Sequence, residues 1–175
     1  TAGTVSSANG TIEFNGNAAQ GVPAVTYYHL KINKPAVTLP EQTATAAGAL
    51  TINGDFNLLD GAFDPGASSH TVKGNWTESD GAVFQASAGT VALNPAVSTA
   101  IDTATGNNFY NVTLASGSAT VSAGDALTAN GALDMTNGSL TLSNSASHGI
   151  GGNLTIGAGK TLDLTTGSLS VGGAL

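Results

Sequence analysis

Two histidines stand at the start of stretches that read almost alike. His70 opens HTVKGNWT, and His148 opens HGIGGNLT 78 residues later. An imidazole can bind a metal ion or act as a general base. If the chain winds in regular turns, the two rings lie several turns apart, which is too far to share a metal. We expect each histidine to pack at a corner of the fold and to hydrogen-bond a turn carbonyl.

Aspartates offer a second kind of chemistry. Asp134 and Asp163 stand in a shorter echo, LDMTNGSL and LDLTTGSL. Paired carboxylates serve acid–base hydrolysis or calcium binding, as in a polysaccharide-degrading enzyme. An acidic polysaccharide would also require arginine or lysine beside them, and the chain has no arginine. We therefore predict no catalytic residue, no metal site and no cofactor, and expect solvated side chains at Asp55, Asp60, Asp64, Asp134 and Asp163.

Aromatic side chains could form a sugar-stacking platform, from Tyr27 with Phe109 or from Trp76 with Tyr28. The alternation of apolar and polar residues places Tyr28 and Trp76 inside, so the sequence favours core packing. Outward Thr and Ser columns suggest a flat, weakly charged face, which keeps ice binding and glycan binding as alternatives. Asn-X-Ser/Thr triplets are expected by chance in this composition, and they stand at Asn9, Asn75, Asn111, Asn137 and Asn153.

The composition limits the partners. Charged residues make up 9% of the 175 residues, the formal net charge is −7, and the cations are four lysines. Nucleic-acid binding requires clustered basic side chains, so the charge argues against it. No apolar run approaches the ~18 residues that span a bilayer, so we predict no membrane insertion. Cysteine is absent, which removes disulfides and thiolate chemistry.

The elements that must position these residues repeat along the chain. GTIEF at Gly10 returns as GTVAL at Gly89 and GSLSV at Gly167, YYHLKI returns as FYNVTL, and ALTINGDFNL returns as ALTANGALDM. Together with the two histidine stretches they give nine landmarks, about 20 residues apart on average. We divide the chain into super-repeats at residues 10–88 and 89–166, with a third beginning at 167, and expect each to make four turns.

Within each block apolar and polar residues alternate, which is typical of a strand with one buried face. In YYHLKI and FYNVTL the expected inward positions are Tyr28, Leu30, Ile32, Tyr110, Val112 and Leu114. The pattern predicts an all-β fold, a right-handed parallel β-solenoid (β-helix) of about eight coils and roughly 20 residues per coil. A β-sandwich is the alternative, but it gives no reason for the persistent period. Helix should be nearly absent, with residues 41–50 forming loop and strand.

GTVALN, FYNVTL, ALTANGALDM, GSLTL and GGNLTIGAG resemble the degenerate repeats of large bacterial secreted proteins. These are autotransporter passengers, filamentous-haemagglutinin-like adhesins and related giant surface proteins. The resemblance covers nearly the whole chain. It implies a β-solenoid at the bacterial cell surface or outside the cell that acts in adhesion or as a fibre. The chain is shorter than such proteins, which indicates a segment or a subunit.

At both ends of the sequence we expect a solenoid turn without a capping segment. TAGTV at residues 1–5 echoes SAGTV at 87–91, and the chain stops at VGGAL directly after a strand block. An uncapped solenoid end exposes backbone groups and apolar side chains. We expect either further sequence beyond both ends or head-to-tail docking of another copy, which would generate a filament. The predicted function is a non-enzymatic extracellular structural or adhesive module that self-associates end to end, with extracellular glycans as further partners.

Overall fold

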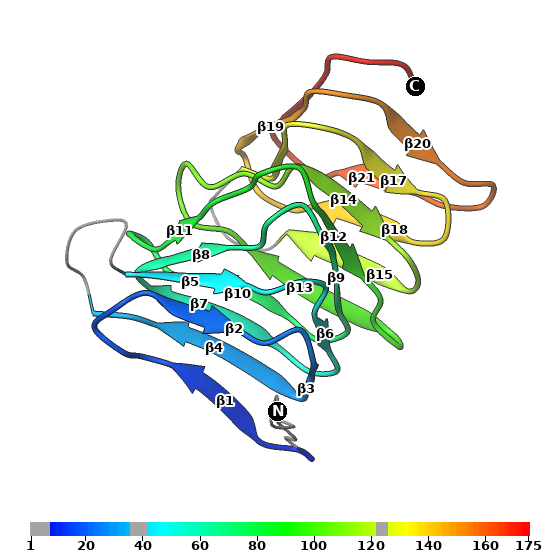
Figure 1. Cartoon of the computed structure of the whole chain (residues 1–175). Helices are drawn as coiled ribbons and strands as arrows, with labels where there is room; N and C mark the ends of the chain where they lie inside the picture. The colour runs from blue at the N-terminus through cyan, green and yellow to red at the C-terminus, as the bar shows by residue number, and fades with distance from the viewer. Residues whose placement is uncertain (1–7, 36–41, 122–125) are drawn as a thin grey trace.

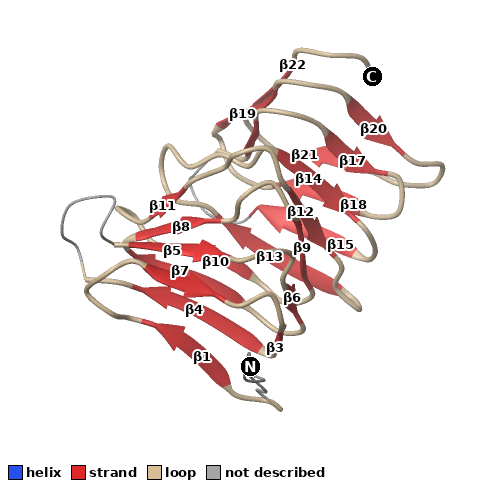
Figure 2. Ribbon diagram, in the orientation of Figure 1, coloured by secondary structure: helices blue, strands red, loops and turns tan. Residues whose placement is uncertain are grey.

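The computed structural model describes residues 8–35, 42–121 and 126–175, and its regular elements there are all strands (Figures 1 and 2). The strands pair in parallel and stack as a β-solenoid of about seven turns, roughly 21 residues apart. This confirms the predicted fold class, because a β-sandwich of the expected kind would pair its strands antiparallel. The Ala-rich stretch contains a strand at residues 43–46, and TAGTV lies outside the described residues.

Four parallel sheets make up the described part of the chain. Sheet A contains β1 (Thr11–Phe14), β4 (His29–Asn33), β7 (Phe56–Asp60), β10 (Trp76–Glu78), β13 (Ser98–Asp102), β15 (Ser118–Val121), β18 (Ser139–Leu142) and β21 (Leu162–Leu164). Sheet B contains β2 (Gln20–Val22), β5 (Thr43–Ala46), β8 (Ala62–Asp64) and β11 (Val83–Phe84). Sheet C contains β3 (Thr26–Tyr27), β6 (Thr51–Ile52), β9 (Ser69–Val72), β12 (Thr90–Leu93), β14 (Asn111–Leu114), β17 (Leu133–Met135) and β20 (Leu154–Ile156). Sheet D contains β16 (Thr128–Ala129), β19 (Ser147–Ile150) and β22 (Ser168–Val171).

The chain visits these sheets in a fixed order (Figure 1). In the first turns it runs from sheet A to sheet B to sheet C and back to A. In the later turns sheet D takes the place of sheet B. The change lies near Phe109, whose backbone forms a parallel bridge with Ala129 of sheet D. Each turn therefore has three faces and three corners.

Apolar side chains fill the interior because alternate residues of each strand point inward. The turns of the N-terminal half and the first turn beyond them bury an aromatic cluster with ring centroids 4.3–6.1 Å apart, formed by Phe56, Phe63, Trp76, Phe84 and Phe109. The later turns are filled with aliphatic side chains, among them Leu127, Leu133, Met135, Leu140, Leu142, Ile150 and Leu154. One contiguous core runs through both halves.

The expected positions of the tyrosines were wrong. Tyr27 and Phe109 are buried, whereas Tyr28 is partly exposed and Tyr110 is 39% exposed. The backbone bends at Tyr28, between β3 and β4, and the same bend occurs at Tyr110. A corner resets the alternation, so the residue before the bend points inward and the bend residue itself points outward. The inward positions of Leu30 and Ile32 agree with the pattern.

The 78-residue interval is not four whole turns. His70 lies in β9 of sheet C, whereas His148 lies in β19 of sheet D. The first stretch rounds the corner from sheet C to sheet A, and the second rounds the corner from sheet D to sheet C. The two stretches share a local corner structure on different faces of the solenoid.

Candidate functional site

The corners contain two columns of stacked residues, which we call corner ladders. The first ladder, between sheets C and A, consists of Tyr28, Gly54, Gly74 and Thr99. The second ladder, between sheets D and C, consists of Tyr110, Gly131, Gly152 and Gly173. Each glycine N–H donates to the carbonyl of the residue below it, at 2.7–2.9 Å. The Thr99 hydroxyl donates to the Gly74 carbonyl at the top of the first ladder.

Glycine is required in the ladders because successive backbones approach closely. A Cβ atom at Gly74 would lie 2.5 Å from the carbonyl carbon of Gly54. At Gly152 it would lie 2.9 Å from the carbonyl carbon of Gly131. The repeated NG, KG and GG pairs in the sequence are therefore a consequence of the stacking.

A polar residue that follows a ladder position caps the next turn. His29 Nδ1 accepts the Asp55 N–H at 2.9 Å, and the Asp55 carboxylate accepts the Asn75 N–H at 2.7 Å. Asn75 in turn accepts the Ala100 N–H at 3.0 Å. The second ladder has two such bonds, from the Ala132 N–H to Asn111 at 2.8 Å and from the Ala174 N–H to Asn153 at 2.9 Å. Three of the Asn-X-Ser/Thr asparagines thus hold turns together.

His70 and His148 are buried and do not lie together. Each Nδ1 accepts a backbone N–H from the preceding turn, Leu50 at 3.2 Å and Leu127 at 3.0 Å. The proton must then sit on Nε2, which in His70 donates to the Pro65 carbonyl at 2.8 Å, as expected. Nε2 of His148 has no partner among the described residues. Burial lowers the pKa of both rings.

The structure separates the aspartates that the sequence paired. Asp134 stands in sheet C between Thr113 and Thr155, whereas Asp163 is exposed in sheet A. Asp60 and Asp64 accept backbone N–H groups of their own turns, at Gly61 and Gly66. Within the described residues, no three His, Asp or Glu side chains gather as a metal site would require.

Glu78 is a buried carboxylate that the sequence reasoning did not single out. It accepts hydrogen bonds from Trp76 Nε1 at 2.7 Å, the Ala104 N–H at 3.1 Å and Asn107 Nδ2 at 2.8 Å. Burial raises the pKa of this carboxyl. The bonds tie β10 to the loop that leads into Phe109. The signal was present in the sequence, since Glu78 follows the inward Trp76 by two residues.

Lys34 is a second buried charge that was not anticipated. Its Nζ donates to the carbonyls of Gly16 and Ala18 and to Oε1 of Gln20, each at 2.8 Å. Burial lowers the pKa of the amine. The ammonium holds the loop of the preceding turn, so its role is in stacking the turns.

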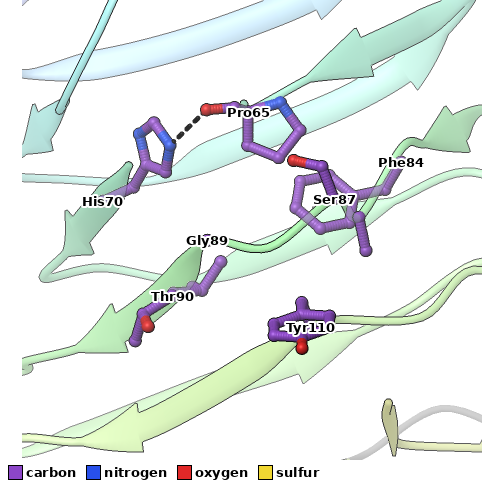
Figure 3. Close-up of a pocket in the computed structure, with 9 residues that line it drawn as sticks. Pro65, His70, Phe84, Ser87, Gly89, Thr90 and Tyr110 are labelled. Atoms are coloured by element: carbon purple, nitrogen blue, oxygen red, sulfur yellow. Dashed lines mark hydrogen bonds between the residues drawn. The ribbon is translucent and has the colours of Figure 1, made fainter. Parts of the chain in front are cut away.

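A shallow hollow lies beside β12 (Figure 3). Its volume is about 10 Å³, space for about one water molecule, and its lining is Pro65, His70, Phe84, Ala86, Ser87, Gly89, Thr90, Val91 and Tyr110. Tyr110 forms an exposed aromatic wall, and Thr90 adds a hydroxyl-bearing side chain. The hollow is too small to enclose a sugar ring, so the group that it leaves open to a ligand is the exposed ring of Tyr110.

The outer surface of sheet C carries a polar column. Successive turns place in register Thr26, Thr51, Thr71, Ala92, Thr113, Asp134 and Thr155. Neighbouring strands in a sheet lie about 4.8 Å apart, so the column repeats hydroxyl and methyl groups at that spacing. This is the clearest of the hydroxyl columns expected from the sequence.

Comparison of the chain with protein-family models, with curated proteins and with solved structures finds no match. The described part of the chain holds no helix of the length and apolar character that crossing a bilayer requires.

Proposed function

We propose that this chain is a non-enzymatic structural module of an extracellular bacterial surface fibre, in which solenoid turns stack end to end. The observation that supports the proposal most is the last turn. Ile156 and Leu164 are 39% and 37% exposed there, directly above the buried Met135 and Leu142. The same apolar columns that hold the turns together therefore continue to an open surface.

Stacking one more turn on this surface would extend contacts that every inner turn already makes. Parallel backbone ladders would supply direction, and burial of the leucine and isoleucine columns would supply the hydrophobic stabilisation. A solenoid has no fixed length, because each turn contacts only its neighbours. The fibre would present neutral hydroxyl and amide side chains outward.

Sedimentation velocity and negative-stain micrographs over a range of concentrations test end-to-end association. We expect Leu164→Lys to lower the mass of the assemblies, because it places a charge on the exposed column. Thr155→Lys, on the outward face of the same turn, is the matched control and should leave the assemblies intact. A chain that stays monomeric at the highest soluble concentration would remove self-association from the proposal.

The adhesive form of the proposal places glycan contact at Tyr110. This side chain is exposed beside the hollow, which Thr90 also lines (Figure 3). Retention of the chain on a glycan array, lost in Tyr110→Ala and kept in Tyr28→Ala, would support it. Equal retention of both variants would assign the contact elsewhere.

Ice binding is a second candidate, supported by the threonine column of sheet C. A flat face that repeats methyl and hydroxyl groups at a fixed spacing can order a matching layer of water. Thermal hysteresis in solutions of the chain would support this function. Thr71→Lys in the middle of the column should then abolish the hysteresis, whereas Thr77→Lys on sheet A should not.

A further inference from the structure

The recurring blocks occupy a different sheet at each recurrence. GTIEF forms β1 in sheet A, GTVAL forms β12 in sheet C, and GSLSV forms β22 in sheet D. The chain runs from A to B or D and then to C, so each recurrence stands one face earlier in the turn. The same shift holds for β4 and β14, β6 and β16, β7 and β17, and β9 and β19.

The strands between the recurrences can be counted. Eleven strands, β1 to β11, precede β12. Ten strands, β12 to β21, precede β22, and the bridge at Phe109 takes the place that β3 holds in the first set. Eleven positions at three per turn advance the chain by three and two-thirds turns. The fractional turn explains why equal sequences meet unequal faces.

Two independent contacts support the equivalence. Val91 of β12 stands in register with His70, and Leu169 of β22 stands in register with His148. Each corner ladder has four members, and the residue after its last member is an alanine whose N–H is capped by an asparagine. These alanines are Ala100, capped by Asn75, and Ala174, capped by Asn153. The second unit therefore reaches the same stage of the repeat at Ala174 that the first reaches at Ala100.

We infer that the outer edge of β22 is built to accept one kind of partner, a parallel strand of the β4 or β14 type that follows an aromatic–tyrosine bend. The reason is that β4 lies on β1 and β14 lies on β12, in register from Thr11 with His29 and from Thr90 with Asn111. Among the described strands, β22 pairs with β19 alone. Such a strand would start a third corner ladder, one face before the second.

The strand that fits this edge best enters at the β4 stage of the repeat, as β4 does on β1 and β14 does on β12, and a folded copy offers that strand only after its β1. A folded copy would present β1 first, and β1 is the counterpart of β22 itself, not of the strand that lies on it. The inference deepens the proposed function and rests on it in one respect, that the solenoid is extended at this end. The edge of β22 accepts a strand according to the position of that strand in the eleven-strand unit. The sheet to which the strand belongs does not decide the choice.

Two fusions of equal length test the inference. Leu175 corresponds to Ile101 in the repeat, so residues 102–118 added after Leu175 continue the eleven-strand unit on new faces. Residues 155–171 added after Leu175 instead repeat the last turn on its own faces, because Ala174 lies over the corner before Leu154. We expect the first fusion to raise Tm by about 5 °C or more, and to slow amide exchange in β22 at least tenfold. The second should do neither.

Phe109→Ala within the added segment should cancel the gain, because the bend would lose its buried ring. Equal or greater stabilisation by the second fusion would overturn the inference, and so would no stabilisation by either. Measurements at a concentration where the parent chain is monomeric keep this result separate from end-to-end association. If the parent chain does not associate end to end but the first fusion is stabilised, the inference about the strand that β22 accepts still stands.

Discussion

The N-terminal and C-terminal halves of the solenoid have the same corners and different cores. Both halves stack glycines at one corner and cap the next turn with an Asn, Asp or His side chain. The first half surrounds Trp76 with phenylalanine rings, whereas the second half is aliphatic around Leu154, the counterpart of Trp76. The solenoid therefore demands strict backbone chemistry at its corners and tolerates different packing inside.

The difference has a geometric cause. At Gly74 and Gly152 the backbone of one turn lies against the backbone of the turn below, so even one added carbon has no space there. Inside, side chains of one layer meet side chains of the next, and a large residue in one turn is balanced by its neighbours. The aromatic cluster also lies at the end of sheet B, next to the loop that is hydrogen-bonded to Glu78 through Ala104 and Asn107.

The largest loss of stability is expected at Trp76, which belongs to the aromatic core and also donates a hydrogen bond to Glu78. Trp76→Leu gives the first half the residue of the second half. It should nevertheless cost about 4 kcal/mol of unfolding free energy, because it empties space among the rings and leaves Glu78 without its indole donor. Leu154→Ala should cost about 2 kcal/mol. Urea unfolding checks both, and a cost below about 1 kcal/mol for Trp76→Leu would mean that the cores are interchangeable.

The corner ladders should respond alike in both halves. Gly74→Ala and Gly152→Ala should each cost about 2–3 kcal/mol, since the added methyl group collides with backbone of the turn below. Gly21→Ala is the matched control, because no atom lies within 4 Å of the place that its added methyl group would occupy, and it should be neutral or slightly stabilising. A mild effect at Gly74 alone would break the equivalence of the two ladders.

The fold was predictable because the alternation of apolar and polar residues recurs in every turn of a solenoid. Spacing and alternation located the strands, and both depend on neighbours in sequence. The positions of Tyr28 and Tyr110 failed because alternation holds along a strand and is reset by a bend. The prediction that each super-repeat makes four whole turns was wrong for a related reason. A recurring corner sequence does not indicate which of the three corners of the solenoid it forms.

The buried charges could be found from sequence only in part. Alternation places Glu78 inward, but its partners Ala104 and Asn107 belong to the following turn. Lys34 likewise reaches carbonyls of the preceding turn. Contacts between turns depend on loop lengths, and those vary along the chain. The separation of Asp134 from Asp163 is another such case, because their local stretches are alike and their sheets differ.

The histidines should make both halves sensitive to acid. Protonation of His70 or His148 would place an N–H against the backbone N–H that Nδ1 accepts. Their folded-state pKa values lie below the unfolded value near 6.5, so the unfolded state takes up protons first. Stability is fully present above that value and falls as the pH drops toward the folded pKa, by up to about 1.4 kcal/mol per pH unit for each ring.

Urea unfolding at pH 7.5, 6.5 and 5.5 measures this slope. His148→Leu should flatten it at a modest cost at pH 7.5, because the Leu127 N–H loses its acceptor while a ring N–H without a partner in the described residues is removed. His70→Leu should flatten it equally and cost more at pH 7.5, because the bond to Pro65 is lost. Glu78 acts with the opposite sign: its raised pKa favours folding at low pH and disfavours it as the pH rises through that pKa. Glu78→Gln should therefore steepen the acid loss, and an unchanged slope in all three variants would place the acid sensitivity elsewhere.

The smallest effect tests whether the caps act through the acceptor oxygen. Asn75→Ala removes the acceptor of the Ala100 N–H and should cost about 1 kcal/mol. Asn75→Asp should retain most of the stability, because Asp55 already makes the same bond one turn below. In the second half Asn153→Ala frees the Ala174 N–H in the last turn. Its effect should appear as faster local amide exchange there, with little change in global unfolding, since an outer turn of a stacked array opens without the rest.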